Sequence, residues 1–394
     1  MTDNTLKNSE GMLQSEAPSV QEKITSTTWP GLEQALDFAA LSTSVRPFIK
    51  PIIERLDLPK RLAKMALMRK KSGGKQDAHL LAQAARTLAP NDIHVRHLTA
   101  WLTRWNVPLW HFRIIHDRPR NEAYSRALTH FVKPGMTVFE IGTGTGILAM
   151  LAARAGASHV YTCERRAEVA EAARAIIARN HLSDRITVIA KDARDVRLGE
   201  DIPERADLFV AEIVDDGLLG ESVLPLTELA VKNFLKPGAI LLPRHISAMG
   251  CIVSGRNLRE SYRMDEVMGF DLTPFNRFSP LEIGVQMRGG DAEPLSETIE
   301  LIGFDLNADA FPDGIHPVSL PVNTPGTAAG VMKWLRLDFG DGIFFENCPS
   351  QQSSWAPHLH ILPDARPVKP GDIVEIEIHH EKESIFLSPR ILSP

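Results

Sequence analysis

The feature that most constrains the fold of this chain is an apolar segment that ends in three closely spaced glycines. Residues 138–147 read Val-Phe-Glu-Ile-Gly-Thr-Gly-Thr-Gly-Ile, and an alanine-rich run follows until Gly156. Because Gly142, Gly144 and Gly146 lack a Cβ, the turn can adopt positive φ and leave bare amides at the carboxyl end of the strand. The pattern predicts a strand, a tight turn and a helix, the unit that opens a doubly wound α/β domain.

An acidic residue then follows at the place expected for a nucleoside site. Glu164 ends a second apolar segment, 159–163, and a carboxylate there can accept hydrogen bonds from both hydroxyls of a ribose. The third glycine arrives one residue earlier than in the dinucleotide fingerprint, and no Lys-Ser or Lys-Thr pair completes a P-loop. We therefore predict a site for S-adenosylmethionine, which has a ribose and an adenine but no phosphate. A purely structural glycine turn is the alternative.

The α/β alternation continues beyond this segment. A helix is predicted at 167–180 and strands at 186–190, 206–210 and 239–242. Asp192 and Ala193 follow the third strand, where the Asp192 carboxylate is placed to reach an adenine amino group.

Composition and periodicity divide the chain into four parts. Residues 1–28 are polar and are expected to be a disordered tail. Residues 29–106 show helical periodicity and contain one hairpin of the tetratricopeptide kind. Residues 107–243 form the cofactor domain, and in residues 244–394 short alternating runs split by Gly and Pro predict a β-barrel or sandwich. The fold class is thus α/β, with a Rossmann-like domain between helices and a β domain.

Charge and cysteine content restrict the partners and the location of the protein. The formal net charge is -5 at pH 7, which leaves no basic excess for nucleic acid. No run reaches the roughly 20 apolar residues of a membrane-spanning helix, and the first residues lack the apolar core of a signal peptide. The cysteines, Cys163, Cys251 and Cys348, are scattered and offer no zinc spacing. We expect a cytoplasmic protein without a metal, a nucleic-acid partner or a membrane partner.

Two carboxylates bracket a glycine-containing loop after the fourth strand. Residues 211–221 read Ala-Glu-Ile-Val-Asp-Asp-Gly-Leu-Leu-Gly-Glu, which places Glu212 and Glu221 at the carboxyl edge of the sheet. Facing carboxylates repel each other, but a guanidinium offers each of them two parallel hydrogen bonds. Beside a methyl sulfonium, this loop is suited to placing a methyl group on an arginine nitrogen. Two solvated loop acids are the alternative.

Together these motifs resemble the protein arginine methyltransferase family, closest to the branch that includes the type III, monomethylating enzymes. The resemblance covers the chain from Trp110 to its end. Residues 138–147 are similar to the first cofactor motif, Glu164 to the ribose carboxylate, and Glu212 to Glu221 to the double-glutamate loop of that family.

The resemblance also assigns roles to residues that precede the glycine turn. It places His111 and Ile114 in a helix that covers the cofactor, and Arg120 at the arginine that binds the methionine carboxylate. Asp117 matches an aspartate that pairs with the histidine of a late Thr-His-Trp loop. Here that loop reads Ser353-Ser354-Trp355, so we expect Trp355 to wall the guanidinium channel while Ser354 replaces the histidine.

The activity implied by the resemblance is S-adenosylmethionine-dependent N-methylation of the arginine guanidinium in a protein or peptide, chiefly to monomethylarginine, with Glu212 and Glu221 as the catalytic residues. A homodimer is expected, through an arm at Phe270–Phe278 that projects from the β domain. Three alternatives stay open: methylation of free arginine or a small guanidine, a non-catalytic S-adenosylmethionine-binding scaffold, and a nicotinamide oxidoreductase. The early third glycine and the paired glutamates argue against the last.

Overall fold

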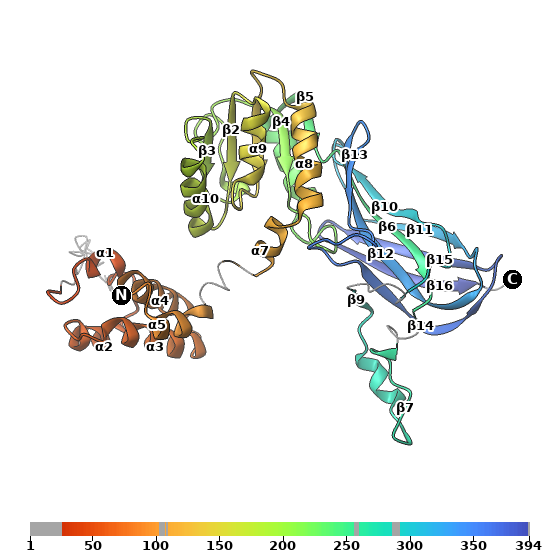
Figure 1. Ribbon diagram of the computed structural model, residues 1–394, viewed down its shortest axis with the longest axis horizontal. Coiled ribbons are helices and arrows are strands. Elements are labelled where there is room, and N and C mark those ends of the chain that lie inside the picture. Colours follow the sequence, from red (N-terminus) through yellow and green to blue (C-terminus); the bar gives the residue numbers. More distant parts are fainter. Residues whose placement is uncertain (1–25, 102–106, 108, 256–259, 286–291, 393–394) are drawn as a thin grey trace, which may run out of the picture. The chain divides into compact units, whose positions relative to one another are not determined.

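The computed structural model describes residues 26–101, 107, 109–255, 260–285 and 292–392. The chain divides into two compact units, residues 1–108 and 109–394 (Figure 1). Most of the predicted tail, residues 1–25, lies outside the described residues. In the part of the chain that the structure describes, no helix is long and apolar enough to cross a membrane.

The first unit is a small helical domain built around two long helices. Its helices are α1 (Leu32–Ala35), α2 (Arg46–Ile49), η1 (Lys50–Ile52), α3 (Leu58–Lys71), α4 (Lys75–Leu88) and α5 (Ile93–Leu98). Leu62 of α3 and Leu81 of α4 are fully buried in one core. Asp92 begins α5 because its side chain accepts hydrogen bonds from the amides of His94 and Val95. The predicted hairpin is α4 and α5, and α5 is only 6 residues long.

A five-stranded parallel sheet forms the first half of the second unit, with the strand order β3-β2-β1-β4-β5. The strands are β1 (Thr137–Ile141), β2 (His159–Cys163), β3 (Ile186–Ile189), β4 (Ala206–Ala211) and β5 (Leu235–Leu242). The helices beside them are α8 (Arg118–Phe131), α9 (Ile147–Ala155), α10 (Ala167–Arg179) and α11 (Val223–Phe234). The strand order reverses between β1 and β4, the position where doubly wound sheets bind ligands.

The predicted start of β5 was wrong. The Pro237-Gly238 pair suggested that the strand starts at Ala239, whereas β5 begins at Leu235 and already pairs there with Ala206 of β4. The pairing then shifts register before Leu208. A proline is tolerated here because β5 is an edge strand of this sheet.

Antiparallel sheets form the second half of the unit. One has the order β10-β6-β12-β14-β9, with β13 paired to β12, and another has the order β11-β15-β16. Their strands are β6 (His245–Val253), β9 (Glu282–Gly284), β10 (Ile299–Asp305), β11 (Gly314–Pro321), β12 (Gly326–Gly340), β13 (Ile343–Glu346), β14 (His358–Val368), β15 (Ile373–Glu381) and β16 (Ser384–Leu392). Along β15, Val374, Ile376 and Ile378 are buried while the residues between them face solvent, the period of two that the sequence shows.

The two halves of this unit share one hydrophobic core. Tyr124 of α8 packs edge-on against Phe339 of β12, with 4.8 Å between ring centroids. Its hydroxyl donates to the carbonyl of Ala211 at the end of β4, at 2.9 Å. Helix α8 therefore fixes the end of β4, and the loop that follows it, against the β domain.

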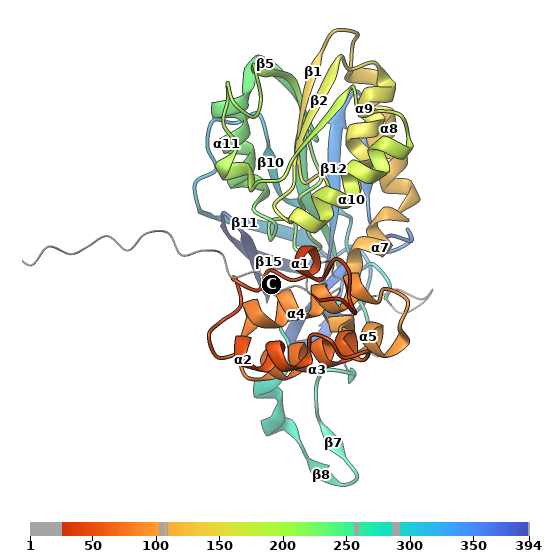
Figure 2. The ribbon, with the colours of Figure 1, turned by 90° about the vertical axis from the view of Figure 1, so that its left-hand side faces the viewer.

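One segment projects from the antiparallel sheets, as Figures 1 and 2 both show. It contains the two-stranded ribbon β7 (Glu266–Val267) and β8 (Phe270–Asp271) and the short helix η3 (Thr273–Phe278). The chain then enters β9, which pairs with His358–His360 of β14.

Candidate active site

A cavity of about 360 Å³ lies at the carboxyl ends of β1, β2 and β4. It brings together the residues that the sequence analysis assigned to the cofactor and to the glutamate loop. These are His111, Ile114, Arg120, Gly142, Gly144, Glu164, Asp192, Ala193, Glu212 and Glu221. His111 and Ile114 belong to α7 (Trp110–Ile115), which supplies part of the wall.

The glycine turn has the backbone conformation that the sequence predicts. Gly142, Gly144 and Gly146 have φ values of 89°, 53° and 80°, a region that other residues rarely adopt. A Cβ on Gly142 would also lie 3.0 Å from the Ile213 side chain. Thr143 secures the turn through a 2.7 Å hydrogen bond with the hydroxyl of Thr162 on β2.

The carboxylate of Glu164 is held in place by backbone amides. It accepts hydrogen bonds from the amide of Gly144 at 3.2 Å and from the amide of Arg166 at 2.9 Å. At the next strand end, Asp192 accepts from the amide of Arg194 at 3.0 Å and begins the short helix η2 (Ala193–Asp195). Backbone amides therefore orient both carboxylates, and the expected roles of Glu164 toward a ribose and of Asp192 toward an adenine stay predictions.

A fifth carboxylate at the cavity, Glu140 of β1, was missed by the sequence analysis. Burial, and then the nearby charges of Glu164 and Glu212, raise its pKa to about 8, although a hydrogen bond from Thr162 opposes the shift. A neutral carboxyl at the cavity wall can donate a hydrogen bond as well as accept one. The available signal was the single acidic residue inside the apolar run Val-Phe-Glu-Ile.

The two glutamates of the loop after β4 both have raised pKa values. Burial raises the pKa of Glu212 to about 7, with Arg120 opposing the shift and Glu221 adding to it. Partial burial, and then the charge of Asp215, raise the pKa of Glu221 to about 7. The charge of Glu221 disfavours ionisation of Glu212, and a cation bound beside the two carboxyls would favour the ionised form of both.

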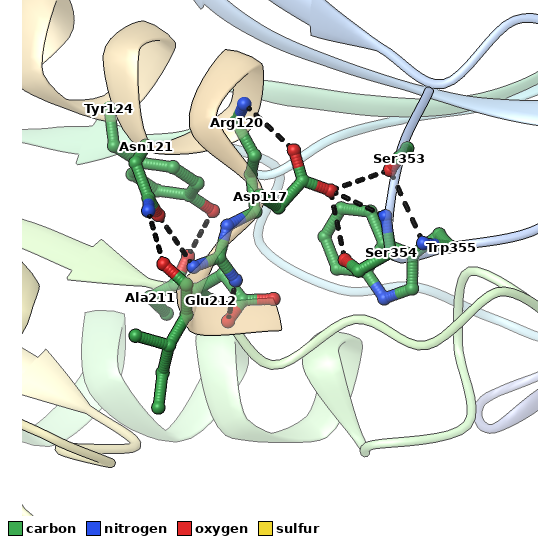
Figure 3. Close-up of polar contacts among 10 residues, drawn as sticks. Asp117, Arg120, Asn121, Tyr124, Ala211, Glu212, Ser353, Ser354 and Trp355 are labelled. Atoms are coloured by element: carbon green, nitrogen blue, oxygen red, sulfur yellow. Dashed lines mark hydrogen bonds and ion pairs between the residues drawn. The ribbon is translucent and has the colours of Figure 1, made fainter. Parts of the chain in front are cut away.

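A buried ion pair joins the two halves of the site, and the sequence analysis did not predict it. The Arg120 guanidinium lies 2.7 Å from the Glu212 carboxylate, and its side chain is only 3% exposed (Figure 3). Another nitrogen of the same guanidinium donates to the side chain of Asn121 at 2.7 Å. Arg120, expected to bind the cofactor carboxylate, therefore also fixes one of the two expected catalytic glutamates.

The comparisons with known proteins agree with this geometry. Residues 124–243 match the family model described as ribosomal protein L11 methyltransferase (PrmA). Over 281 residues the chain is 36% identical to an arginine N(omega)-methyltransferase of Streptomyces achromogenes subsp. streptozoticus. The match covers 71% of this chain and 78% of the relative. The chain belongs to the arginine methyltransferase family.

More distant members of the family are longer proteins. Human protein arginine N-methyltransferase 9 is 29% identical over 318 residues, and the match covers 70% of this chain but 37% of that protein. Among solved structures, the Trypanosoma brucei PRMT1 enzyme–prozyme complex with AdoHcy has a TM-score of 0.65 at 20% identity and covers 73% of this chain and 94% of that one. Arabidopsis thaliana protein arginine methyltransferase 10 has a TM-score of 0.60 at 23% identity, with coverages of 73% and 94%. These two structures support the fold.

Opposite Asp117, where the family resemblance implies a histidine, this chain has two serines. One Asp117 oxygen accepts hydrogen bonds from the Ser353 hydroxyl at 2.7 Å, the Ser354 amide at 2.7 Å and the Ser354 hydroxyl at 2.9 Å (Figure 3). The other oxygen accepts from the amide of Arg120 at 3.2 Å. Asp117 thus ties the start of α8 to the β domain without an imidazole.

The structure places Trp355 behind the site and not on the cavity wall. The residue is 7% exposed, and its ring packs against Phe345 with 5.8 Å between ring centroids. The Arg120 guanidinium lies 6.0 Å from the ring centroid, and neither Trp355 nor Asp117 lines the cavity. The Trp355 ring thus packs beside Arg120 outside this cavity, and its expected place at the guanidinium channel stays a prediction.

The predicted family, fold class and S-adenosylmethionine-dependent arginine methyltransferase assignment are confirmed. The residues suit that cofactor, since the glycine turn, Glu164 and Arg120 offer amides, a carboxylate and a guanidinium to its three polar parts. The roles of the individual residues stay predictions. Within the described ranges, no three His, Cys, Asp or Glu side chains are grouped in a way that could hold a metal ion.

Proposed function

We propose that this protein transfers a methyl group from S-adenosylmethionine to a guanidinium nitrogen of arginine, and that the acceptor is a protein or peptide. The observation that carries the proposal is the buried contact between Arg120, on the cofactor side, and Glu212, on the acceptor side. It supports the proposal because it joins the arginine expected to bind the cofactor to the double-glutamate loop, and both line one cavity.

The chemistry that fits this geometry is mainly positioning. The bound cofactor supplies the methyl group, which leaves sulfur as the new carbon–nitrogen bond forms, and one nitrogen proton is released. Glu212 and Glu221 hold the guanidinium so that one nitrogen points along the methyl–sulfur bond. By drawing positive charge onto the other nitrogens they leave the attacking nitrogen more nucleophilic, and either carboxylate can accept the released proton.

Free arginine is a second candidate acceptor, and one observation favours it. The streptomycete relative, at 36% identity, is named for arginine alone, whereas relatives named for protein arginine are 28% and 29% identical. Mass spectrometry of reactions with free arginine and with an arginine-rich peptide, at equal guanidinium concentration, separates the two acceptors. Methylation of free arginine alone would refute the protein or peptide proposal.

Replacing Glu212 or Glu221 by Gln tests the guanidinium clamp. Each change removes a charge at constant size, and we expect methyl transfer to fall at least about a hundredfold, the equivalent of about 2.7 kcal/mol of transition-state stabilisation. The product of the wild type should be chiefly monomethylarginine. Glu375, an exposed residue of β15, provides the matched control, since Glu375→Gln should leave the rate unchanged. If the wild type binds S-adenosylmethionine but methylates no form of arginine, the scaffold alternative replaces this proposal.

We also propose a homodimer formed through the projecting arm. Three aromatic side chains of the arm are largely exposed: Phe270 at 71%, Phe275 at 61% and Phe278 at 63%. Clustered apolar side chains of this kind favour a protein partner. Light scattering at micromolar concentration should give a dimer mass for the wild type and a monomer mass for Phe275→Asp, and a monomeric wild type would contradict the proposal.

A cytoplasmic location is proposed on the basis of the cysteines. Cys163, Cys251 and Cys348 are all unpaired, and the first two are buried, as suits a reducing compartment. Fractionation of cells that carry the tagged chain would test this.

A further inference from the structure

A cluster of charged side chains lies in the β domain outside the cavity. Its centre is Glu282 of β9, whose carboxylate contacts Lys333 of β12 at 3.1 Å, His360 of β14 at 2.5 Å, and Nδ1 of His358. The Lys333 side chain is only 1% exposed and that of His360 only 7%. These contacts hold the pKa of Glu282 well below its usual range, although burial opposes the shift. The cluster is therefore an assembled ion-pair network.

The other ring nitrogen of His358 faces the double-glutamate loop, residues 212–221. Its Nε2 lies 3.2 Å from the carboxylate of Asp216, which stands midway between Glu212 and Glu221. Burial lowers the pKa of His358, but the hydrogen bonds and charges of Asp216 and Glu282 outweigh burial and raise it to about 9. A ring with a carboxylate at each nitrogen needs a proton on both, so the group is an imidazolium at neutral pH.

The double-glutamate loop is also stabilised by contacts of its own, in addition to the ion pair between Asp216 and His358. Asp215 accepts a hydrogen bond from the amide of Gly220 at 3.0 Å, and Leu218 and Leu219 are buried. The hydrogen bond between Asp215 and Gly220 lies within the loop and sets its shape. The ion pair between Asp216 and His358 connects the middle of the loop to that strand.

We propose that His358 is a positioning residue for methyl transfer, which holds Asp216 and thereby the orientation of Glu221 toward the acceptor guanidinium. The proposal rests on the proposed function. The opposite interpretation is that His358 serves only to neutralise Glu282, in which case Asp216 is an ordinary half-exposed acid of the surface.

A double-mutant cycle of His358→Gln and Asp216→Asn separates these interpretations. We expect each single variant to lower kcat/KM for the arginine acceptor about tenfold, as for the loss of one close ion pair, through a higher KM for that acceptor. The double variant should also lose about tenfold and not about a hundredfold, because both changes break the same contact. The affinity for S-adenosylhomocysteine should stay within about twofold of the wild type. Since the Asp216 side chain is 49% exposed, Asp216→Asn should fold even if His358→Gln does not.

Two further measurements fix the outcome. His358→Lys retains a cation and should recover part of the loss, while His379→Gln, at a partly exposed histidine of β15, should behave as the wild type. Hydrogen exchange of the amides of 213–220 should accelerate equally in the two single variants and the double variant. This readout does not need turnover, so it decides the proposal even if the wild type fails to methylate arginine, which would overturn the proposed function instead. Losses that multiply in the double variant, or unchanged exchange in the loop, would overturn the positioning role.

Discussion

The raised pKa values of the two loop glutamates predict a steep loss of activity on mild acidification. A guanidinium clamp needs both carboxylates ionised, and the pKa values of Glu212 and Glu221 are each raised to about 7. A carboxyl group with a raised pKa is charged above that value and becomes neutral as the pH falls through it. Because the arginine guanidinium stays protonated throughout, methyl transfer should be present above pH 7 and lost below it.

The size of the effect follows from the two ionisations. With a pKa of about 7, each carboxyl is about 0.91 ionised at pH 8 and about 0.09 ionised at pH 6. The fraction of molecules in which both carboxyls are ionised is about 0.83 at pH 8 and about 0.008 at pH 6. We therefore expect kcat/KM to fall about a hundredfold from pH 8 to pH 6. The two apparent pKa values belong to the coupled pair, so the prediction concerns the total drop and a limiting slope of two.

The assay is kcat/KM for the arginine acceptor from pH 5.5 to pH 8.5, with the affinity for S-adenosylhomocysteine measured at each pH. The affinity measurement detects any change in cofactor binding that comes from Glu140, a cavity carboxyl whose own pKa is raised to about 8. Glu221→Gln, at its low residual rate, should show a limiting slope of one. A flat profile between pH 6 and pH 8, or a slope of two that survives in Glu221→Gln, would refute the reasoning.

Three other substitutions test the cofactor site and the loop. Glu164→Ala should weaken S-adenosylhomocysteine binding at least about tenfold, because one or two charged hydrogen bonds of about 1.5 kcal/mol each are lost; unchanged affinity in calorimetry would place the ribose elsewhere. Gly220→Ala would set a Cβ 2.0 Å from the Asp215 carboxylate, so we expect about tenfold slower methyl transfer with unchanged cofactor affinity. Gly217→Ala, whose Cβ would lie 3.2 Å from the same carboxylate, should be milder, and equal rates in the two variants would contradict the proposed cause.

The cofactor half of the site could be predicted because its residues follow regular positions in the chain. The carboxyl ends of parallel strands meet at one edge of the sheet, so Glu164, Asp192 and Glu212 could be assigned to the same cavity from strand periodicity alone. The substrate half could not be predicted as well. Trp355 was assigned to the guanidinium channel from its motif position, which gives no information about which way a ring packs. In the structure the ring packs beside Phe345.

The sequence by itself determined which backbone turns and strand ends form, since a glycine turn and alternating strands depend on neighbouring residues. Tertiary structure decided which charges meet. Asp117 and Ser353 are 236 positions apart, and no local pattern predicts that two serine hydroxyls and an amide satisfy this carboxylate. The same holds for Arg120 with Glu212, and for His358 between Asp216 and Glu282. The ionisation of these groups depends on their charged partners and on their burial. Partners and burial are both set by the tertiary fold, which brings together segments that are far apart in the sequence.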